Sequence, residues 1–220
     1  MTQRLLVFRT WGGKRTGAGR KRIGPRPNVP HGRRPRHRAA EPVHVTLRAV
    51  RGLPQLRSKR VFPSLRKAIS IGSNGAFRVI QFSVQTNHVH LLVEAADKCA
   101  LTRGMQGLGI RLAKAINRLS ERHGRVWADR YHAHALRTPR EVRHALAYVL
   151  LNGRKHRVSG PGVDPCSSGA WFDGWVEPVS ASAGRSPTKR PGTWLLRLGW
   201  RRHGLIRFDE SPSPHTRLRR

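Results

Sequence analysis

The chain has 220 residues, with 44 lysines and arginines against 11 aspartates and glutamates, so its formal net charge is +33. A surplus of that size indicates a polyanionic partner, and we expect nucleic acid. No apolar run approaches the roughly 18 residues of a membrane-spanning helix, and the N-terminus lacks a signal peptide's apolar core. We therefore expect a cytoplasmic, nucleoid-associated protein with no membrane partner. Cys99 and Cys166 stand far apart and predict free thiols rather than a disulfide framework.

Composition divides the chain into two basic flanks and a periodic centre. Residues 1–41 are rich in glycine, proline and arginine, and the first forty hold twelve basic residues and no acidic one. We expect this arm to be disordered and either to lie along DNA phosphates or to serve as a solvated tether. Residues 42–157 have the size of one ordinary domain. Residues 158–220 form a basic extension rich in proline, serine and arginine, in which the apolar run at 194–200 predicts one short helix or strand.

The first half of the central region changes period from strand to helix and back. Residues 43–50 alternate as a strand, and Pro63 opens a helix that ends near Gly72. Residues 77–85 form a second strand. The two-residue link that follows predicts a hairpin with a third strand over 88–94.

The second half of the region predicts two longer helices around a fourth strand. Apolar residues recur every three or four positions over 101–122, as in an amphipathic helix, and 126–136 contains a strand. Thr138 and Glu141 form a capping box around a proline and start a helix that stops at residues 152–153. The order β-α-β-β-α-β-α predicts an α+β fold, a ferredoxin-like split β-α-β sheet with an extra C-terminal helix. Right-handed crossovers would pack the first two helices on one face.

The third strand carries two histidines one residue apart. Residues 87–94 are Asn-His-Val-His-Leu-Leu-Val-Glu, and alternate side chains of a strand point to the same face. His88 and His90 therefore project side by side, and two neutral imidazoles make half of a divalent-metal site. Glu94 shares their face and is a rival third ligand. The alternative is a solvated polar face of the sheet.

The last predicted helix presents His144, Tyr148 and Asn152 four residues apart, in one stripe. His88, His90 and Asn152 would supply two nitrogens and one oxygen to a metal, a set that suits Mg²⁺ or Mn²⁺ holding phosphate oxygens better than a closed zinc site. Tyr148 is then a candidate nucleophile, because a phenol with a pKa near ~10 needs a nearby cation or base. The phosphotyrosine product would let a strand be rejoined without ATP. Each residue also has a structural alternative: Tyr148 could close an edge of the core, and Asn152 could end the helix.

Two stretches, NHVHLLVE and WADRYHAHALRTPREVRHALAYVLLN, resemble the REP-associated tyrosine transposases, which are single-tyrosine HUH transposases of the IS200-like type. The His-hydrophobic-His motif of that family is matched by His88 and His90. Its helical Tyr-x-x-x-Asn segment is matched by Tyr148 and Asn152. The resemblance covers about residues 42–157.

The resemblance implies Mg²⁺ or Mn²⁺ as cofactor, no nucleotide cofactor, and single-stranded DNA with hairpins as substrate. Cleavage would leave a 5′-phosphotyrosine and a free 3′-hydroxyl. The family's aromatic-x-x-His strand pattern is matched by Tyr131 and His134. Family members usually follow the asparagine with proline, whereas this chain has Asn152-Gly153.

Basic, aromatic and histidine residues near these motifs are candidate DNA contacts. The candidates are Arg103, Arg111, Lys114, Arg118, Arg130, Tyr131, His134, His144 and Lys155. A solvated helix face is the alternative for the basic residues, and core packing is the alternative for Tyr131. Three function classes remain: a DNA transposase or nickase with a covalent intermediate, a DNA-binding protein of the same fold without activity, and a metal-dependent nuclease that uses water.

Overall fold

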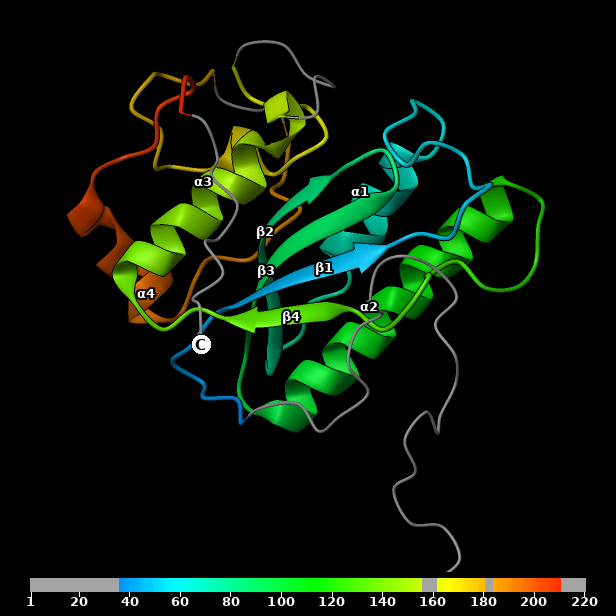
Figure 1. Ribbon diagram of the computed structural model, residues 1–220, viewed down its shortest axis with the longest axis horizontal. Coiled ribbons are helices and arrows are strands. Elements are labelled where there is room, and N and C mark those ends of the chain that lie inside the picture. Colours follow the sequence, from blue (N-terminus) through cyan, green and yellow to red (C-terminus); the bar gives the residue numbers. More distant parts are fainter. Residues whose placement is uncertain (1–35, 156–161, 181–183, 211–220) are drawn as a thin grey trace, which may run out of the picture.

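The computed structural model describes residues 36–155, 162–180 and 184–210. One antiparallel sheet lies at its centre, with the strand order β2-β3-β1-β4 (Figure 1). Its strands are β1 (Val43–Arg48), β2 (Phe77–Val84), β3 (His88–Ala95) and β4 (His132–Ala135). β1 and β3 occupy the middle, as a split β-α-β arrangement requires. The expected ferredoxin-like fold and the expected β2–β3 hairpin are confirmed.

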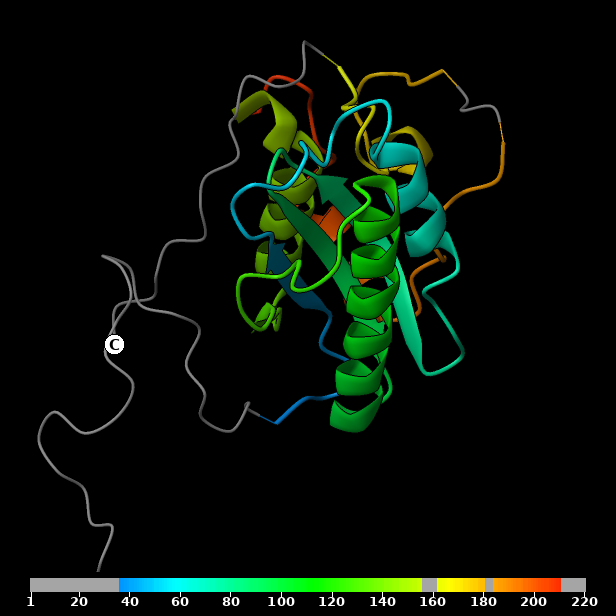
Figure 2. The ribbon, with the colours of Figure 1, turned by 90° about the vertical axis from the view of Figure 1, so that its right-hand side faces the viewer.

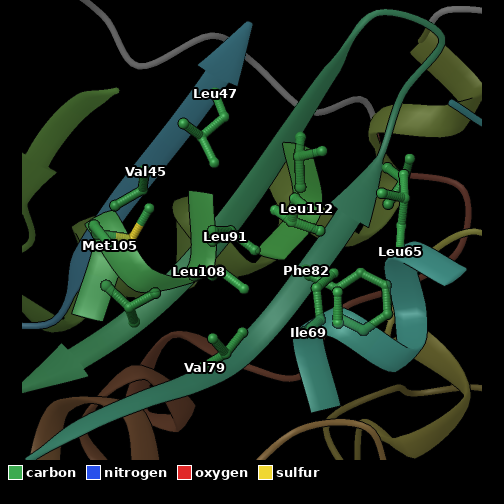
Figure 3. Close-up of a cluster of buried hydrophobic side chains, with 14 of the residues drawn as sticks. Val45, Leu47, Leu65, Ile69, Val79, Phe82, Leu91, Met105, Leu108 and Leu112 are labelled. Carbon is green, nitrogen blue, oxygen red and sulfur yellow. The ribbon is translucent and has the colours of Figure 1, made fainter. Parts of the chain in front are cut away.

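Two helices cover one face of the sheet, as expected from right-handed crossovers (Figure 2). They are α1 (Phe62–Ser70) and α2 (Lys98–Leu119). In Figure 3 their side chains meet those of the strands in one apolar cluster, where Met105 and Leu108 of α2 face Val45 of β1 and Leu91 of β3. The prediction began α2 three residues too late and ended it three residues too late. The helix starts at Lys98 because the side chain of Asp97 accepts a hydrogen bond from the backbone N–H of Ala100 at 2.7 Å.

α3 (Pro139–Lys155) packs on the opposite face of the sheet. The predicted capping box is confirmed: Thr138 Oγ1 accepts from the backbone N–H of Glu141, and Glu141 Oε2 accepts from that of Thr138, both at 3.2 Å. The predicted stop at residues 152–153 is wrong, because the helix continues through Gly153 to Lys155. Leu150, Leu151 and Asn152 are buried, and their packing outweighs the ~1 kcal/mol by which glycine disfavours a helix.

Much of the chain beyond α3 packs back onto the domain. The predicted short element at 194–200 is present as α4 (Trp194–Arg197), followed by a 3₁₀ turn at Gly199–His203. Trp200 and Leu196 are buried in the apolar cluster around α3. Backbone hydrogen bonds from this part of the chain, Val84 N–H to Cys166 O and Lys189 N–H to Val79 O, cover the outer edge of β2. Exposed strand edges invite unwanted pairing, and this contact removes one.

Two expectations about the whole chain concern cysteines and membranes. Cys99 and Cys166 are both free thiols, as expected. In the three described ranges, every helix is too short or too polar to cross a bilayer. The basic arm expected over residues 1–41 falls largely on residues 1–35, which lie outside the described ranges.

Candidate active site

The sheet face beneath α3 carries a band of polar side chains drawn from all four strands. His90 of β3 pairs with Thr46 of β1 on one side and with Ser83 of β2 on the other. Directly paired residues of antiparallel strands point to the same face, so these side chains form one row. The apolar residues that alternate with the histidines along β3 are fully buried on the α1–α2 face, as the alternation predicted. They are Val89, Leu91 and Val93.

His90 is the most enclosed histidine of this band, with 4 % of its surface exposed. Its ring lies 4.7 Å from that of His88 and 5.3 Å from that of His44, centroid to centroid. His90 Nδ1 lies 3.2 Å from His44 Nε2 and 3.1 Å from Thr46 Oγ1. These contacts engage Nδ1 and hold the ring in one orientation, as second partners do for histidines that bind metals.

Tyr148 of α3 faces this histidine cluster. Its ring centroid lies 5.2 Å from that of His90 and 5.7 Å from that of His44, in edge-to-face geometry. The phenol is half-buried, and burial raises the pKa of Tyr148 above its usual range. The folded protein therefore holds a neutral phenol, which becomes a strong nucleophile only when a base or a cation helps remove its proton.

Asn152 lies one helical turn beyond Tyr148 on the same stripe of α3 and is fully buried. Neither Oδ1 nor Nδ2 of this amide has a hydrogen-bond partner among the described residues. Leaving a buried polar group unsatisfied costs about 1–3 kcal/mol. An amide that stays unsatisfied in a buried position has its oxygen and nitrogen left for a ligand. Its role as the third metal ligand beside His88 and His90 stays a prediction.

The rival third ligand, Glu94, is committed elsewhere. Its carboxylate is 2 % exposed and accepts hydrogen bonds from the backbone N–H groups of Gly192 and Thr193 and from Thr193 Oγ1. Arg78 Nη2 donates to it at 2.6 Å. With its oxygens occupied in this way, Glu94 ties β3 to the C-terminal part of the chain. No group of three or more His, Cys, Asp or Glu side chains in the described ranges is placed to bind a metal.

Four of the predicted DNA contacts lie far from this cluster. Arg103, Arg111, Lys114 and Arg118 are exposed on α2, which covers the opposite face of the sheet. Tyr131 packs against the apolar cluster beneath α2, the alternative considered for it. DNA that reached both α2 and Tyr148 would have to pass around an edge of the sheet.

Other predicted contacts lie nearer the cluster. His134 of β4 is exposed and pairs with His44, so it shares the face that carries Tyr148. His144 is exposed on α3; burial, then the nearby charges of Arg140 and Arg143, lower its pKa. Arg130 is half-buried just before β4. The side chain of Lys155 lies outside the described part of the structure.

The sequence prediction missed His44 and Thr46, which hold His90 in place. The signal was present: in the strand Val-His-Val-Thr-Leu-Arg, His44 and Thr46 alternate with valines and leucine at the same two-residue period as His88 and His90. Pairing of this strand with the histidine strand would have placed the two polar sets on one face.

Residues 55–150 match the model of a family described as "Transposase IS200 like". This segment includes His88, His90 and Tyr148 and ends two residues before Asn152. The chain matches no curated protein sequence.

Among solved structures, the fold resembles one described as "Structure of the REP associates tyrosine transposase bound to a REP hairpin". The TM-score is 0.53 at 19 % identity, and the match covers 75 % of this chain and 100 % of the other. At that identity the likeness concerns the fold. Together with the family match, it agrees with the resemblance expected from the two sequence motifs.

Proposed function

We propose that this protein, whose residues 55–150 match the IS200-like transposase family, cleaves and rejoins single-stranded DNA through a covalent phosphotyrosine intermediate. The observation that carries the proposal is the 5.2 Å approach of the Tyr148 and His90 rings, with His88 beside them. It brings a phenol and two imidazoles from α3 and β3 to one place. The hairpin in the related structure supports a DNA substrate that also forms hairpins.

Tyr148 is the proposed nucleophile. Its Oη would attack a backbone phosphorus, forming a P–Oη bond as the P–O3′ bond breaks. The products are a 5′-phosphotyrosine and a free 3′-hydroxyl. The phenol loses a proton and the departing O3′ gains one. Because burial raises the pKa of Tyr148, the phenol of the free protein is protonated near neutral pH, so attack would require a group that takes up its proton.

His88, His90 and Asn152 are the proposed holders of Mg²⁺ or Mn²⁺. His90 Nδ1 is engaged by His44 and Thr46, and His88 Nδ1 lies 2.8 Å from Asn87 Oδ1, so both rings are oriented by second partners. The unsatisfied amide of Asn152 supplies the oxygen. When bound, the ion would act as a Lewis acid on the scissile phosphate and disperse its charge.

The decisive experiment traps the covalent adduct. Full-length protein and a labelled hairpin oligonucleotide are incubated with Mg²⁺ or Mn²⁺ and resolved on a denaturing gel. We expect an adduct with the wild type, none with Tyr148→Phe, and a normal yield with Tyr131→Phe, since Tyr131 packs beneath α2.

The other function classes give different results in the same assay. A binding protein without activity would shift the DNA on a native gel but leave it intact. A nuclease that uses water would release cleaved DNA with no adduct. An adduct that survives Tyr148→Phe would show that the nucleophile is wrongly assigned.

A further inference from the structure

A basic groove runs between α1 and the C-terminal part of the chain, on the side of the sheet away from Tyr148. Five exposed basic residues line it: Arg66, Lys67, Arg185, Lys189 and Arg190. The groove has a volume of about 950 Å³, and its lining contains no acidic residue. Figure 2 shows the two walls, α1 and the segment that follows residue 184, side by side at the edge of the molecule.

The charges of this groove are not neutralised within the described ranges, where none of the five basic residues forms an ion pair with an acidic side chain. A hollow lined by residues next to the ends of β1, β3 and β4 differs in this respect. Arg38 and Arg137 line that hollow too, but Glu41 lies between them at 3.9 and 3.7 Å. Unpaired cations that converge on a concave surface attract a polyanion more strongly than the scattered charges of a basic protein.

The groove is also firmly built. The backbone N–H of Lys189 donates to Val79 O at 2.9 Å, which fixes the basic segment to the edge of β2. Ser186 and Thr188 hydrogen-bond to each other, so their hydroxyls lie in the wall. Hydroxyls and cations are the groups that hold DNA phosphates, whereas unpaired bases need aromatic faces to stack upon. Trp171 is the one aromatic residue of the lining, and it is half-buried.

A second hollow continues the groove toward α3. It has a volume of about 540 Å³ and shares Lys189 and Arg190 with the first. It adds Arg197 and also Arg201, which forms an ion pair at 2.9 Å with Asp173 of the same lining. Leu146 of α3 lines its far side. The two hollows thus form a basic track from α1, around the edge of β2, toward the helix that carries Tyr148.

We propose that this basic groove binds the sugar–phosphate backbone of double-stranded DNA, the paired stem of a hairpin, while the unpaired strand lies at Tyr148. The inference rests on the proposed function for the role of the hairpin, but its test is a binding measurement that needs no cleavage. The groove would hold the stem without regard to its sequence, since phosphate contacts carry no base information.

The test compares two variants matched in residue type. Lys189→Gln/Arg190→Gln removes two cations shared by both hollows. Lys59→Gln/Arg60→Gln removes the same pair from an exposed position that lines neither hollow. Binding to a labelled hairpin, and to an oligonucleotide with the same unpaired sequence and no stem, is measured across a salt series in EDTA. The chelator keeps the DNA uncleaved.

Each duplex phosphate contact contributes about 0.9 to the slope of log binding constant against log salt concentration. The groove variant lacks two cations, so its slope on the hairpin should be smaller by about 1.8. When the salt concentration is raised from about 50 to 200 mM, the wild type should therefore lose roughly ten times more of its affinity for the hairpin than the groove variant does. The control variant should keep the wild-type slope, and the stemless oligonucleotide should bind all three proteins alike.

Three results would overturn the proposal: an unchanged slope in the groove variant, an equal loss in the control, or an equal loss on the stemless oligonucleotide. If the first variant unfolds, Arg66→Gln/Lys67→Gln, on the α1 wall, provides an independent measurement of the same salt slope. A wild type that forms no adduct would refute the proposed chemistry and leave these binding results interpretable.

Discussion

Glu94→Gln should destabilise the whole domain, although the change replaces a carboxylate by an amide of the same shape. Glu94 Oε1 accepts from the backbone N–H and the hydroxyl of Thr193, and Oε2 accepts from Arg78 Nη2 and from the backbone N–H of Gly192. A glutamine can keep the two bonds to Thr193. Its NH₂ group would then face two donors, those of Arg78 and Gly192.

The loss of stability depends on the hydrogen bonds of Glu94 to Arg78 and Gly192. A hydrogen bond to a charged group contributes about 1.5–3 kcal/mol, and buried donors left facing another donor add desolvation. The side chain of Arg78 is 38 % exposed, so solvent compensates part of its loss. We expect the free energy of unfolding to fall by about 3 kcal/mol, which corresponds to a Tm lower by roughly 6–12 °C for a domain of this size.

Urea titration followed by tryptophan fluorescence measures this change, because Trp200 is buried beside the segment that Glu94 holds. Glu121→Gln is the matched control, since Glu121 is exposed, and it should change stability by less than about 0.5 kcal/mol. A Glu94→Gln protein with wild-type stability but with metal-dependent cleavage lost would refute the reasoning, and would make Glu94 a metal ligand instead.

Three further predictions concern the site and the arm. His88→Ala or His90→Ala should abolish cleavage even in excess Mg²⁺ or Mn²⁺, and EDTA should do the same to the wild type; full cleavage in EDTA would exclude a metal. Deleting residues 1–40 should reduce the log–log salt slope by roughly 0.7 per lost contact on single strands or 0.9 on duplex, with adduct yield kept at saturating DNA; an unchanged slope would mean that the arm does not contact DNA. Because burial raises the pKa of Tyr148, its neutral form contributes full stability below the unfolded pKa of about 10, and this contribution is lost as pH rises through the folded pKa. Tyr148→Phe should therefore lose less stability than the wild type between neutral and alkaline pH, as measured by urea titration; equal losses would mean that the phenol is not effectively buried.

The order of the elements followed from the sequence because period and capping are local properties. Leu65, Ala68 and Ile69 are the buried residues of α1, as their spacing predicted. The ends of the longer helices were predicted less well. α2 begins at Lys98 because of its Asp97 cap. α3 continues through Gly153 because Leu150 and Leu151, just before it, pack against neighbours distant in sequence.

By itself, the sequence determined which side chains share a strand face or a helix stripe, because backbone geometry places His88 with His90 and Tyr148 with Asn152. Only the tertiary structure decided which of these sets meet. Strand pairing brought His44 against His90, and the packing of α3 placed Tyr148 above them. It also put α2 and its arginines on the opposite face, because the face of a sheet that a helix covers depends on chain crossover and on contacts between distant residues.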